Sequence, residues 1–343
     1  MKGKKHLACG LLLGALAAAA GAQGTSNVTL YGRVDIGLRL EDPEFGSSTT
    51  AVVSGVHSGS RWGLIGSEDL GNGLKAIFNL ESGFNTDTGT MAQGGRLFGR
   101  QAWAGIEGGF GQVRLGRIDL VGNDITPAVD PFLTAFGDAG MQSTFSPPDI
   151  GRTDNAIIYT SPKLAGATVY AGYATRLDGV EVPGRSNNPW VTTSGVRYAS
   201  GPLLAILTYE AIHNPAAGAP SAKMVQVGAT YDLAVVKLHA IFGTEKDMFT
   251  GATVTNSADS RSHLLGLSAP VGSSGKLLTS YQKRDDRTAD NADLRVFAAG
   301  YLHALSRRTN LYAYVSDADG KGSIATNAGF NRRQYVVGMR HLF

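Results

Sequence analysis

The sequence predicts an all-β fold: a transmembrane, antiparallel, up-and-down β-barrel of sixteen strands with an inward-folded third extracellular loop. Three observations predict it. Runs of about ten residues alternate between apolar and polar side chains, and this is the length that a tilted strand needs to cross a bilayer. The connections between the runs are alternately short and long. No apolar run of about 18 residues follows the N-terminal segment, which excludes a spanning helix.

Residues 1–22 predict a cleaved secretory signal peptide, which leaves 23–343 as a single barrel domain. Three lysines precede an apolar run over 7–20, and small residues at 20–22 suit cleavage. The single cysteine, Cys9, lies in this segment, so the mature chain has no thiol or disulfide chemistry. Without the three lysines, the 31 basic residues fall to 28 and match the 28 acidic ones, so charge gives no reason to expect a nucleic-acid partner.

The run over 28–40 shows the alternation most clearly. Its even positions are apolar or glycine, and its odd positions carry all of the charge, at Arg33, Asp35 and Arg39. Alternate side chains of a strand point to opposite faces, so one face is apolar and the other is charged. In a membrane barrel the apolar face meets lipid and the charged face lines a water-filled lumen. A secreted soluble β-domain with an adhesive role, which would bury the apolar face, is the alternative.

The other fifteen runs follow along the chain and are bounded by residues that favour turns. They are 59–69, 74–84, 96–107, 110–118, 152–161, 167–176, 191–199, 203–212, 222–232, 235–245, 259–268, 275–285, 292–304, 309–317 and 333–343. Short turns such as Gly71-Asn72-Gly73 supply the backbone angles of tight turns. Loops such as 41–58 and 317–332 are long and polar. Short turns at one end and long loops at the other are typical of outer-membrane barrels.

The last run carries a second signal. Tyr335, Val337, Met339 and Phe343 share one face. An apolar alternation that ends in Phe is what the barrel-assembly machinery reads in outer-membrane strands, so Phe343 is the expected assembly signal. Tyrosines near the ends of several runs are expected in the aromatic girdles of the barrel. They are Tyr159, Tyr209, Tyr231, Tyr281 and Tyr301.

The connection between Arg117 and Arg152 is far longer than the others. Loops beyond about 15 residues are uncommon unless they have a function. It combines carboxylates with large apolar side chains, namely Asp124, Asp130, Asp138, Phe132, Phe136 and Phe145. This composition favours a loop that packs on the inner wall and presents carboxylates to water. A loop that extends into the surroundings is the alternative.

Two apparent motifs do not indicate a bound group. Residues 71–76 match a loose dinucleotide fingerprint, but a strand pattern follows where the helix should begin. Residues 317–320 resemble the start of a calcium loop but lack the later ligands. The seven histidines are scattered without a nucleophile in suitable spacing. The sequence therefore predicts no enzyme, no cofactor and no metal site.

Six segments carry a resemblance to a known family. They are S-N-V-T-L-Y-G (26–32), S-R-W-G-L-I-G-S-E-D-L-G (60–71), G-L-K-A-I-F (73–78), L-F-G-R-Q-A (97–102), L-G-R (115–117) and L-S-R-R-T-N-L-Y (305–312). The chain resembles the general porins of Gram-negative bacteria, in the β-proteobacterial and neisserial branch. The resemblance implies a sixteen-stranded outer-membrane barrel, a homotrimer, and a third loop inside the pore. Its expected partners are outer-membrane lipids and lipopolysaccharide, the barrel-assembly machinery, and small hydrophilic solutes and ions.

In that family, wall arginines face acidic residues of the third loop and narrow the channel. The matching wall positions are Arg61 in S-R-W-G-L, Arg100 in F-G-R-Q-A, and Arg152 just before Asp154. Strand parity supports the assignment, since Trp103 would point to the opposite face from Arg100. Ordinary pairing of these arginines with neighbouring wall carboxylates is the alternative.

Further pore-lining residues and the acidic partners follow from parity and position. Arg33, Asp35, Arg114 and Asp154 are expected to line the pore. Asp124 and Asp130 are expected on the acidic side of the third loop. The predicted function is passive diffusion of small polar solutes with a weak preference for anions. A channel specific for an anionic solute or organic acid is the second possibility.

Overall fold

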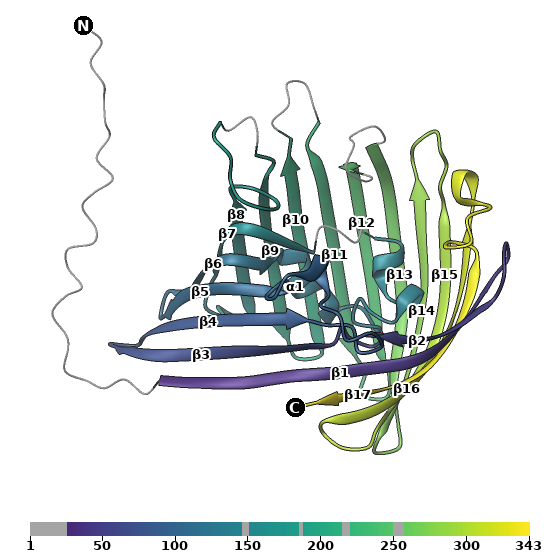
Figure 1. Cartoon of the computed structure of the whole chain (residues 1–343), viewed down its shortest axis with the longest axis horizontal. Helices are drawn as coiled ribbons and strands as arrows, with labels where there is room; N and C mark the ends of the chain where they lie inside the picture. Colours follow the sequence, from purple (N-terminus) through teal and green to yellow (C-terminus); the bar gives the residue numbers. More distant parts are fainter. Residues whose placement is uncertain (1–25, 146–150, 185–187, 215–219, 250–256) are drawn as a thin grey trace, which may run out of the picture.

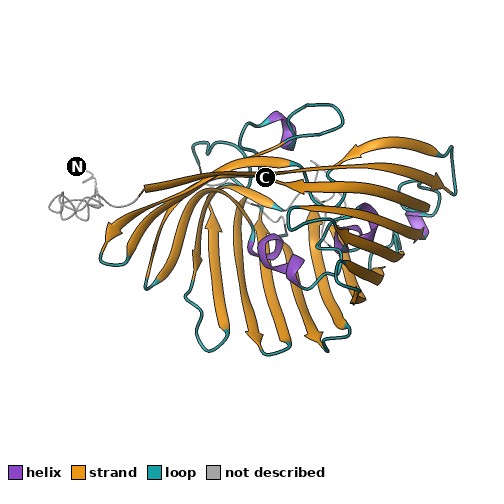
Figure 2. Ribbon diagram, turned by 90° about the horizontal axis from the view of Figure 1, so that it is seen from below, coloured by secondary structure: helices purple, strands orange, loops and turns teal. Residues whose placement is uncertain are grey.

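The computed structural model describes residues 26–145, 151–184, 188–214, 220–249 and 257–343. The signal peptide expected at 1–22 lies outside these residues. The described strands form one antiparallel sheet that closes on itself, because β1 pairs with β17 on one edge and with β2 and β3 on the other (Figures 1 and 2). The all-β barrel is therefore confirmed.

The strands in chain order have the following bounds. They are β1 (Ser26–Pro43), β2 (Thr49–Ser54), β3 (Arg61–Gly71), β4 (Leu74–Gly83), β5 (Gln101–Gly108), β6 (Gly111–Asp119), β7 (Arg152–Thr160), β8 (Ala167–Ala174), β9 (Trp190–Ser200), β10 (Leu203–His213), β11 (Ala222–Asp232), β12 (Lys237–Phe249), β13 (Ser257–Val271), β14 (Gly275–Asp286), β15 (Leu294–Ala304), β16 (Thr309–Gly320) and β17 (Arg332–Leu342).

The barrel has sixteen strand positions although seventeen strands are described. β2 pairs with residues 36–41 of β1, and β3 pairs with residues 26–33 of the same edge, so the two strands share one position. β2 lies in the segment 41–58 that was expected to be loop, because its six residues, T-T-A-V-V-S, are shorter than a spanning strand and do not alternate strictly. The other difference is at β5, which begins at Gln101 and not at residue 96.

The apolar half of each strand faces outward. On β1, Leu30 is 59% exposed, whereas Asp35 on the opposite parity is 0% exposed. Four of the five expected girdle tyrosines, Tyr209, Tyr231, Tyr281 and Tyr301, are at least 36% exposed. Exposed apolar side chains on every part of a closed sheet suit a lipid surround and would be unfavourable in water. None of the helices in the described part of the chain is long and apolar enough to cross a membrane.

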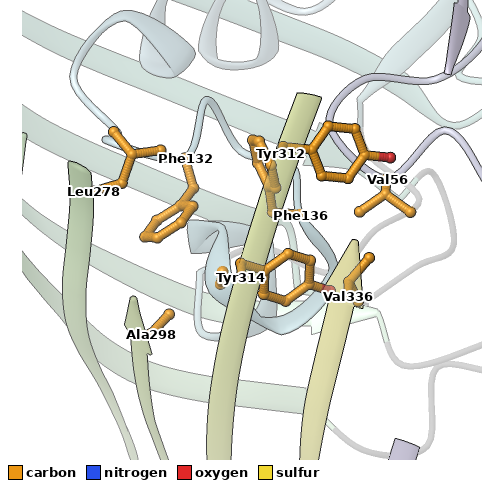
Figure 3. Packing of buried hydrophobic residues seen from close by; sticks show 9 residues of the cluster. Val56, Phe132, Phe136, Leu278, Ala298, Tyr312, Tyr314 and Val336 are labelled. Carbon is orange, nitrogen blue, oxygen red and sulfur yellow. The ribbon is translucent and has the colours of Figure 1, made fainter. Parts of the chain in front are cut away.

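The third loop lies against the inner wall of the later strands. It contains the short helix α1 (Val121–Ile125) and the 3₁₀ turns η2 (Thr126–Ala128), η3 (Gly137–Ala139) and η4 (Met141–Ser143). Phe132 and Phe136 are at most 1% exposed and pack with Tyr312 and Tyr314 of β16 (Figure 3). The loop therefore folds inward and does not extend into the surroundings.

Glycines on the inner wall make room for this loop. A Cβ at Gly195, Gly228, Gly243, Gly266 or Gly300 would lie less than 3.0 Å from an apolar side chain of the loop. The opposing side chains are Val121, Val129, Phe145, Pro131 and Phe132, in that order. We call these five positions the glycine seat. They lie on β9, β11, β12, β13 and β15, so the loop crosses this half of the barrel in direct contact with its backbone.

Hydrogen bonds from inward-facing polar side chains hold the same loop. Glu210 on β10 accepts from the Gly122 N–H at 2.8 Å, and His239 on β12 contacts the Val129 carbonyl through Nδ1 at 3.0 Å. Gln282 on β14 donates to the Ala139 carbonyl at 2.7 Å. These wall side chains are buried and polar, and each satisfies a backbone group of the loop that would otherwise be unpaired. The loop is thus fixed along β9–β17.

Candidate functional site: the arginine belt

The opposite half of the lumen, from β1 to β7, carries a row of arginines. We call Arg33, Arg61, Arg100, Arg114, Arg117 and Arg152 the arginine belt. At its centre, Glu81 of β4 accepts from Arg100 Nε at 2.7 Å and lies 3.5 Å from Arg61 Nη1. Tyr31 donates its hydroxyl to the other Glu81 oxygen at 2.9 Å. The register pairs Tyr31 with Gly63 and Gly63 with Glu81, so these side chains share the inner face.

Arg100 reaches the belt by a route that strand parity did not predict. Trp103 shares the inner face with Gln101, to which it donates a 2.8 Å hydrogen bond, and it stacks with Arg114. The argument that Trp103 points away from the lumen is therefore wrong. Arg100 precedes β5, so strand alternation does not apply to it. Its backbone N–H donates to the Glu81 carbonyl at 3.2 Å, and this contact places the Arg100 side chain on the inner face.

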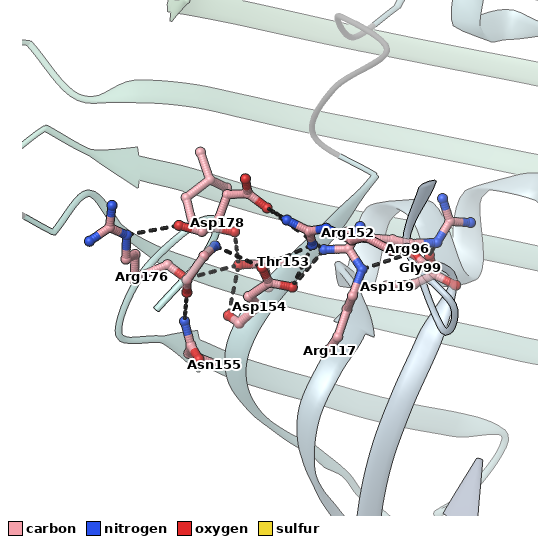
Figure 4. Close-up of polar contacts among 12 residues, drawn as sticks. Arg96, Gly99, Arg117, Asp119, Arg152, Thr153, Asp154, Asn155, Arg176 and Asp178 are labelled. Carbon is pink, nitrogen blue, oxygen red and sulfur yellow. Dashed lines mark hydrogen bonds and ion pairs between the residues drawn. The ribbon is translucent and has the colours of Figure 1, made fainter. Parts of the chain in front are cut away.

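The belt continues onto β6 and β7 through two further carboxylates. Arg152 lies 2.9 Å from Asp119, at the ends of their paired strands. Arg117 donates to Asp154 at 2.6 Å, and the same carboxylate receives Arg96 from the preceding loop at 3.0 Å (Figure 4). Asp154 therefore faces the lumen as part of an ion-pair network, in agreement with the parity of its strand.

Positive charge exceeds negative charge in the belt. Arg33 lies directly opposite Arg61 across the β1–β3 pair and makes no ion pair with any residue that the structure describes. The carboxylates that contact the belt are Glu81, Asp119, Asp124, Asp154 and, at 4.0 Å from Arg117, Asp178. Six guanidiniums thus meet five carboxylates, and two of these, Asp154 and Asp178, also pair with Arg96. The surplus is a permanent positive field because arginine does not deprotonate in proteins.

The third loop contributes less negative charge than expected. Asp124 faces the belt, with its carboxylate 3.8 Å from Arg114 and a 44% exposed side chain. Asp138 forms a two-point ion pair with Arg332 of β17, with both contacts at 2.8 Å. Among the residues described, Arg61, Arg100 and Arg152 make ion pairs with wall carboxylates and with no acid of the third loop.

Asp130 and Asp35 do not face the lumen, which corrects the expectation for both. The Asp130 carboxylate is 1% exposed and accepts N–H donors from Phe132, Thr134 and Met141 at 2.8 to 2.9 Å, so it shapes the loop. Burial raises the pKa of Asp130 to about 6, while the three donors act in the opposite direction. Asp35 is 0% exposed and accepts from the Tyr312 hydroxyl at 2.7 Å and the Ser58 N–H at 2.8 Å. Segment 55–60 covers it.

The sequence interpretation missed the carboxylates that the belt arginines contact. Glu81 shares its parity with Asn79 and Lys75, so the alternation of the run 74–84 could have placed it in the lumen. Asp119 follows Arg117 by two residues and could have been found in the same way. Within the described residues no group of three or more His, Cys, Asp or Glu side chains is placed to hold a metal ion.

Comparison with known proteins agrees with this architecture. The profile of a family described as Gram-negative porin matches residues 9–323. An outer membrane porin protein of Bordetella pertussis is 35% identical over 393 residues, covering 99% of this chain and 100% of the relative. Outer membrane porin protein 32 of Delftia acidovorans is 32% identical over 358 residues, covering 97% of this chain and 99% of the relative.

Solved structures give the same result for the fold. The anion-selective porin from Comamonas acidovorans superposes with a TM-score of 0.77 at 28% identity, covering 93% of this chain and 100% of that one. Porins are channels rather than enzymes, and the relatives are outer-membrane proteins. The closed barrel, its lipid-compatible surface and the charged lumen are consistent with that class. This chain belongs to the Gram-negative porin family and is a β-barrel of the outer membrane.

Proposed function

We propose that the chain forms a water-filled channel for passive diffusion of small hydrophilic solutes and ions, with a weak preference for anions. The observation that carries the proposal is the surplus of guanidiniums in the arginine belt, where six arginines meet five carboxylates. The likeness to the anion-selective porin from Comamonas acidovorans supports the same sign of selectivity.

The ion pairs of the belt favour transit of an anion over its capture. Glu81 already accepts a hydrogen bond from Arg100, and Asp119 holds Arg152, so a passing anion meets guanidiniums whose charge is partly compensated. Such a site raises the local anion concentration without stripping the ion of water, because direct two-point binding would require the wall carboxylate to be displaced. We expect weak selectivity and no saturation with chloride.

The test is the reversal potential of the purified protein in a planar bilayer with a KCl gradient. We expect the natural chain to prefer chloride, and the triple variant Arg61→Gln, Arg100→Gln, Arg152→Gln to shift toward potassium. Arg333→Gln is the matched control, because this arginine pairs with Asp317 where both side chains are at least 58% exposed. A cation preference of the natural chain, or a triple variant indistinguishable from it, would overturn the proposal.

A second candidate is a channel specific for an anionic solute or organic acid. One observation favours it, a pocket in the lumen wall near Trp103 that combines apolar side chains with Lys75 and Glu107 and lies beside Arg114. Conductance that saturates with the solute, and chloride current that the solute blocks, would distinguish this candidate from general diffusion.

We also propose that the chain assembles as a homotrimer, in contact with lipids and lipopolysaccharide, after insertion by the barrel-assembly machinery with Phe343 as its signal. The contacts of Phe343 support a role at the seam of the barrel, since its N–H and carbonyl each bond to Gly32 at 3.0 Å. Mass measurement of the detergent-extracted protein tests the trimer, and a monomer mass under mild conditions would contradict it. Loss of membrane insertion in Phe343→Ala would support the signal.

A further inference from the structure

The lumen wall on the side of the short turns contains an apolar stripe. Ile65 of β3, Ile77 of β4 and Trp103 of β5 share the inner face, with Asn79 directly opposite both Ile65 and Trp103. Ile77 is two residues from Asn79 and is therefore the diagonal neighbour of both. Ile65 is 45% exposed, and the other two are half-buried. The inner face of a porin barrel is ordinarily polar, so three adjacent apolar side chains require an explanation.

The stripe lines a pocket that also contains charged and polar groups. The pocket has a volume of about 340 Å³, and its lining also includes Lys75, Glu107 and Gln112 and the polar side chains of Asn27, Thr29 and Ser67. Gly105 leaves the position opposite Ile77 without a side chain, and a Cβ there would meet the Val113 carbonyl oxygen at 2.3 Å. The close approach of β6 therefore requires a glycine at this position.

Two cations lie next to the stripe, Lys75 in the pocket lining and Arg114 beside the Trp103 ring, and neither has a short ion pair with a described residue. Arg114 holds its guanidinium 5.5 Å from the centre of the Trp103 ring, and its contact with Asp124 is long, at 3.8 Å. Lys75 makes no ion pair within the described residues. Glu107, opposite Lys75 in the register, already accepts a hydrogen bond from Gln112 at 3.2 Å. An incoming carboxylate therefore finds donors at two edges of an apolar floor.

The pocket lies downstream of the arginine belt for a solute entering from the long-loop side. Ile77 precedes Glu81 by four residues on β4, which places the stripe roughly 13 Å from the centre of the belt along the strand. The belt enriches anions and excludes cations before they reach the pocket. This order of elements favours an anion over a cation as the occupant.

We propose that this pocket is a binding subsite for small aromatic monocarboxylates, with the ring on Trp103, Ile77 and Ile65 and the carboxylate at Lys75 and Arg114. The proposal rests on the anion preference proposed above and names the solute class that the channel retains. An aromatic ring stacks on an indole or lies against aliphatic side chains, whereas acetate offers no surface to this floor.

The test uses benzoate as the probe in a planar bilayer that contains the purified full-length barrel. We expect benzoate to reduce the chloride current in a saturable manner, and acetate and benzylammonium at equal concentration to leave it unchanged. Trp103→Ala should raise the half-blocking concentration about three- to tenfold, and Trp103→Phe should retain most of the block. If Trp103→Ala does not insert, Ile77→Thr keeps the β-branched shape and tests the apolar floor instead.

Ile106→Thr is the matched control, since it makes the same change on the outward face of β5, where Ile106 is 42% exposed. It should leave the benzoate block unchanged. Block by acetate equal to that by benzoate, block by benzylammonium, or an unchanged half-blocking concentration in the pocket variants would overturn the subsite. The chloride preference in a KCl gradient is measured separately, so failure of the subsite is distinguishable from failure of the diffusion proposal.

Discussion

Glu81 offers the sharpest test of the charge balance in the belt. We expect Glu81→Gln to increase the anion preference without disturbing the wall. The glutamine is isosteric, so its oxygen can accept from Arg100 as Glu81 does now at 2.7 Å. Its amide can donate to the Tyr31 oxygen, because the Tyr31 hydroxyl has a second acceptor in Asn79 at 3.0 Å. One negative charge is removed and every hydrogen-bonding group keeps a partner.

The magnitude follows from the Coulomb interaction in water. A unit charge about 5 Å from a passing ion contributes about 0.8 kcal/mol, and screening at 0.1 M salt reduces this to about 0.5 kcal/mol. That energy changes the local concentration of an ion roughly twofold. Removing the charge favours chloride and disfavours potassium by the same factor, so the chloride-to-potassium permeability ratio should rise about fivefold.

The assay is the reversal potential across a KCl gradient, repeated at high salt. The shift caused by Glu81→Gln should shrink at 1 M salt, where the screening length falls to about 3 Å. Asp317→Asn is the matched control, because it removes one carboxylate from an exposed pair with Arg333 and should leave the ratio unchanged. A ratio that falls, or an equal shift in both variants, would refute the assignment of Glu81 to the conducting path.

Three further predictions concern the third loop. The pKa of Asp130, raised by burial to about 6 from an ordinary 3.8, means that the folded chain holds this proton more tightly than the unfolded chain. Stability against heating should therefore fall by about 3 kcal/mol as the pH rises from 3.8 to 6 and then level off, and Asp130→Asn should abolish this dependence. Arg332→Gln leaves Asp138 without its two-point partner and should weaken the attachment of the loop to the wall by about 2 to 4 kcal/mol. Single-channel recording should then show increased current noise, and unchanged noise would contradict the prediction. Gly300→Ala brings a Cβ to 2.9 Å from Phe132 and should destabilise the packed loop by about 1 to 3 kcal/mol. Proteolysis of the loop should become faster, and an unchanged rate would show that the glycine seat tolerates a methyl group.

Strand periodicity predicted the barrel because successive residues of a strand alternately face lipid, which favours apolar side chains, and the water-filled lumen, which favours polar ones. No tertiary information was needed to place Val28 and Leu30 on one face and Arg33 and Arg39 on the other. β2 was not predicted because it has only six residues and its two valines, Val52 and Val53, are adjacent, which breaks the alternation. Parity also failed for Arg100, since the chain there is not yet a strand and its direction depends on the contact with Glu81.

The third loop shows a different limit. Its inward packing followed from three phenylalanines in a long connection, and Phe132, Phe136 and Phe145 are all buried. The role of each aspartate could not be predicted from the sequence, because it depends on tertiary contacts. Asp130 accepts hydrogen bonds from three N–H groups of the loop itself, and Asp138 pairs with Arg332 of β17. The glycine seat was equally hidden. The sequence alone does not distinguish a glycine that packs against a side chain distant in the chain from a glycine that forms a turn.

The third loop packs along most of its length against β9–β17, so the two halves of the barrel have different roles. On β9–β17, most substitutions of inward-facing residues would change contacts with the loop and disturb its packing. The other half carries the arginine belt and meets the loop at fewer points, among them Arg114 with Asp124 and the Val56 carbonyl with the Phe136 N–H. Substitutions on β1–β7 can therefore change solute preference during evolution while the packing of the loop is kept. For the same reason, lumen residues on those strands are the ones to replace when a new selectivity is designed.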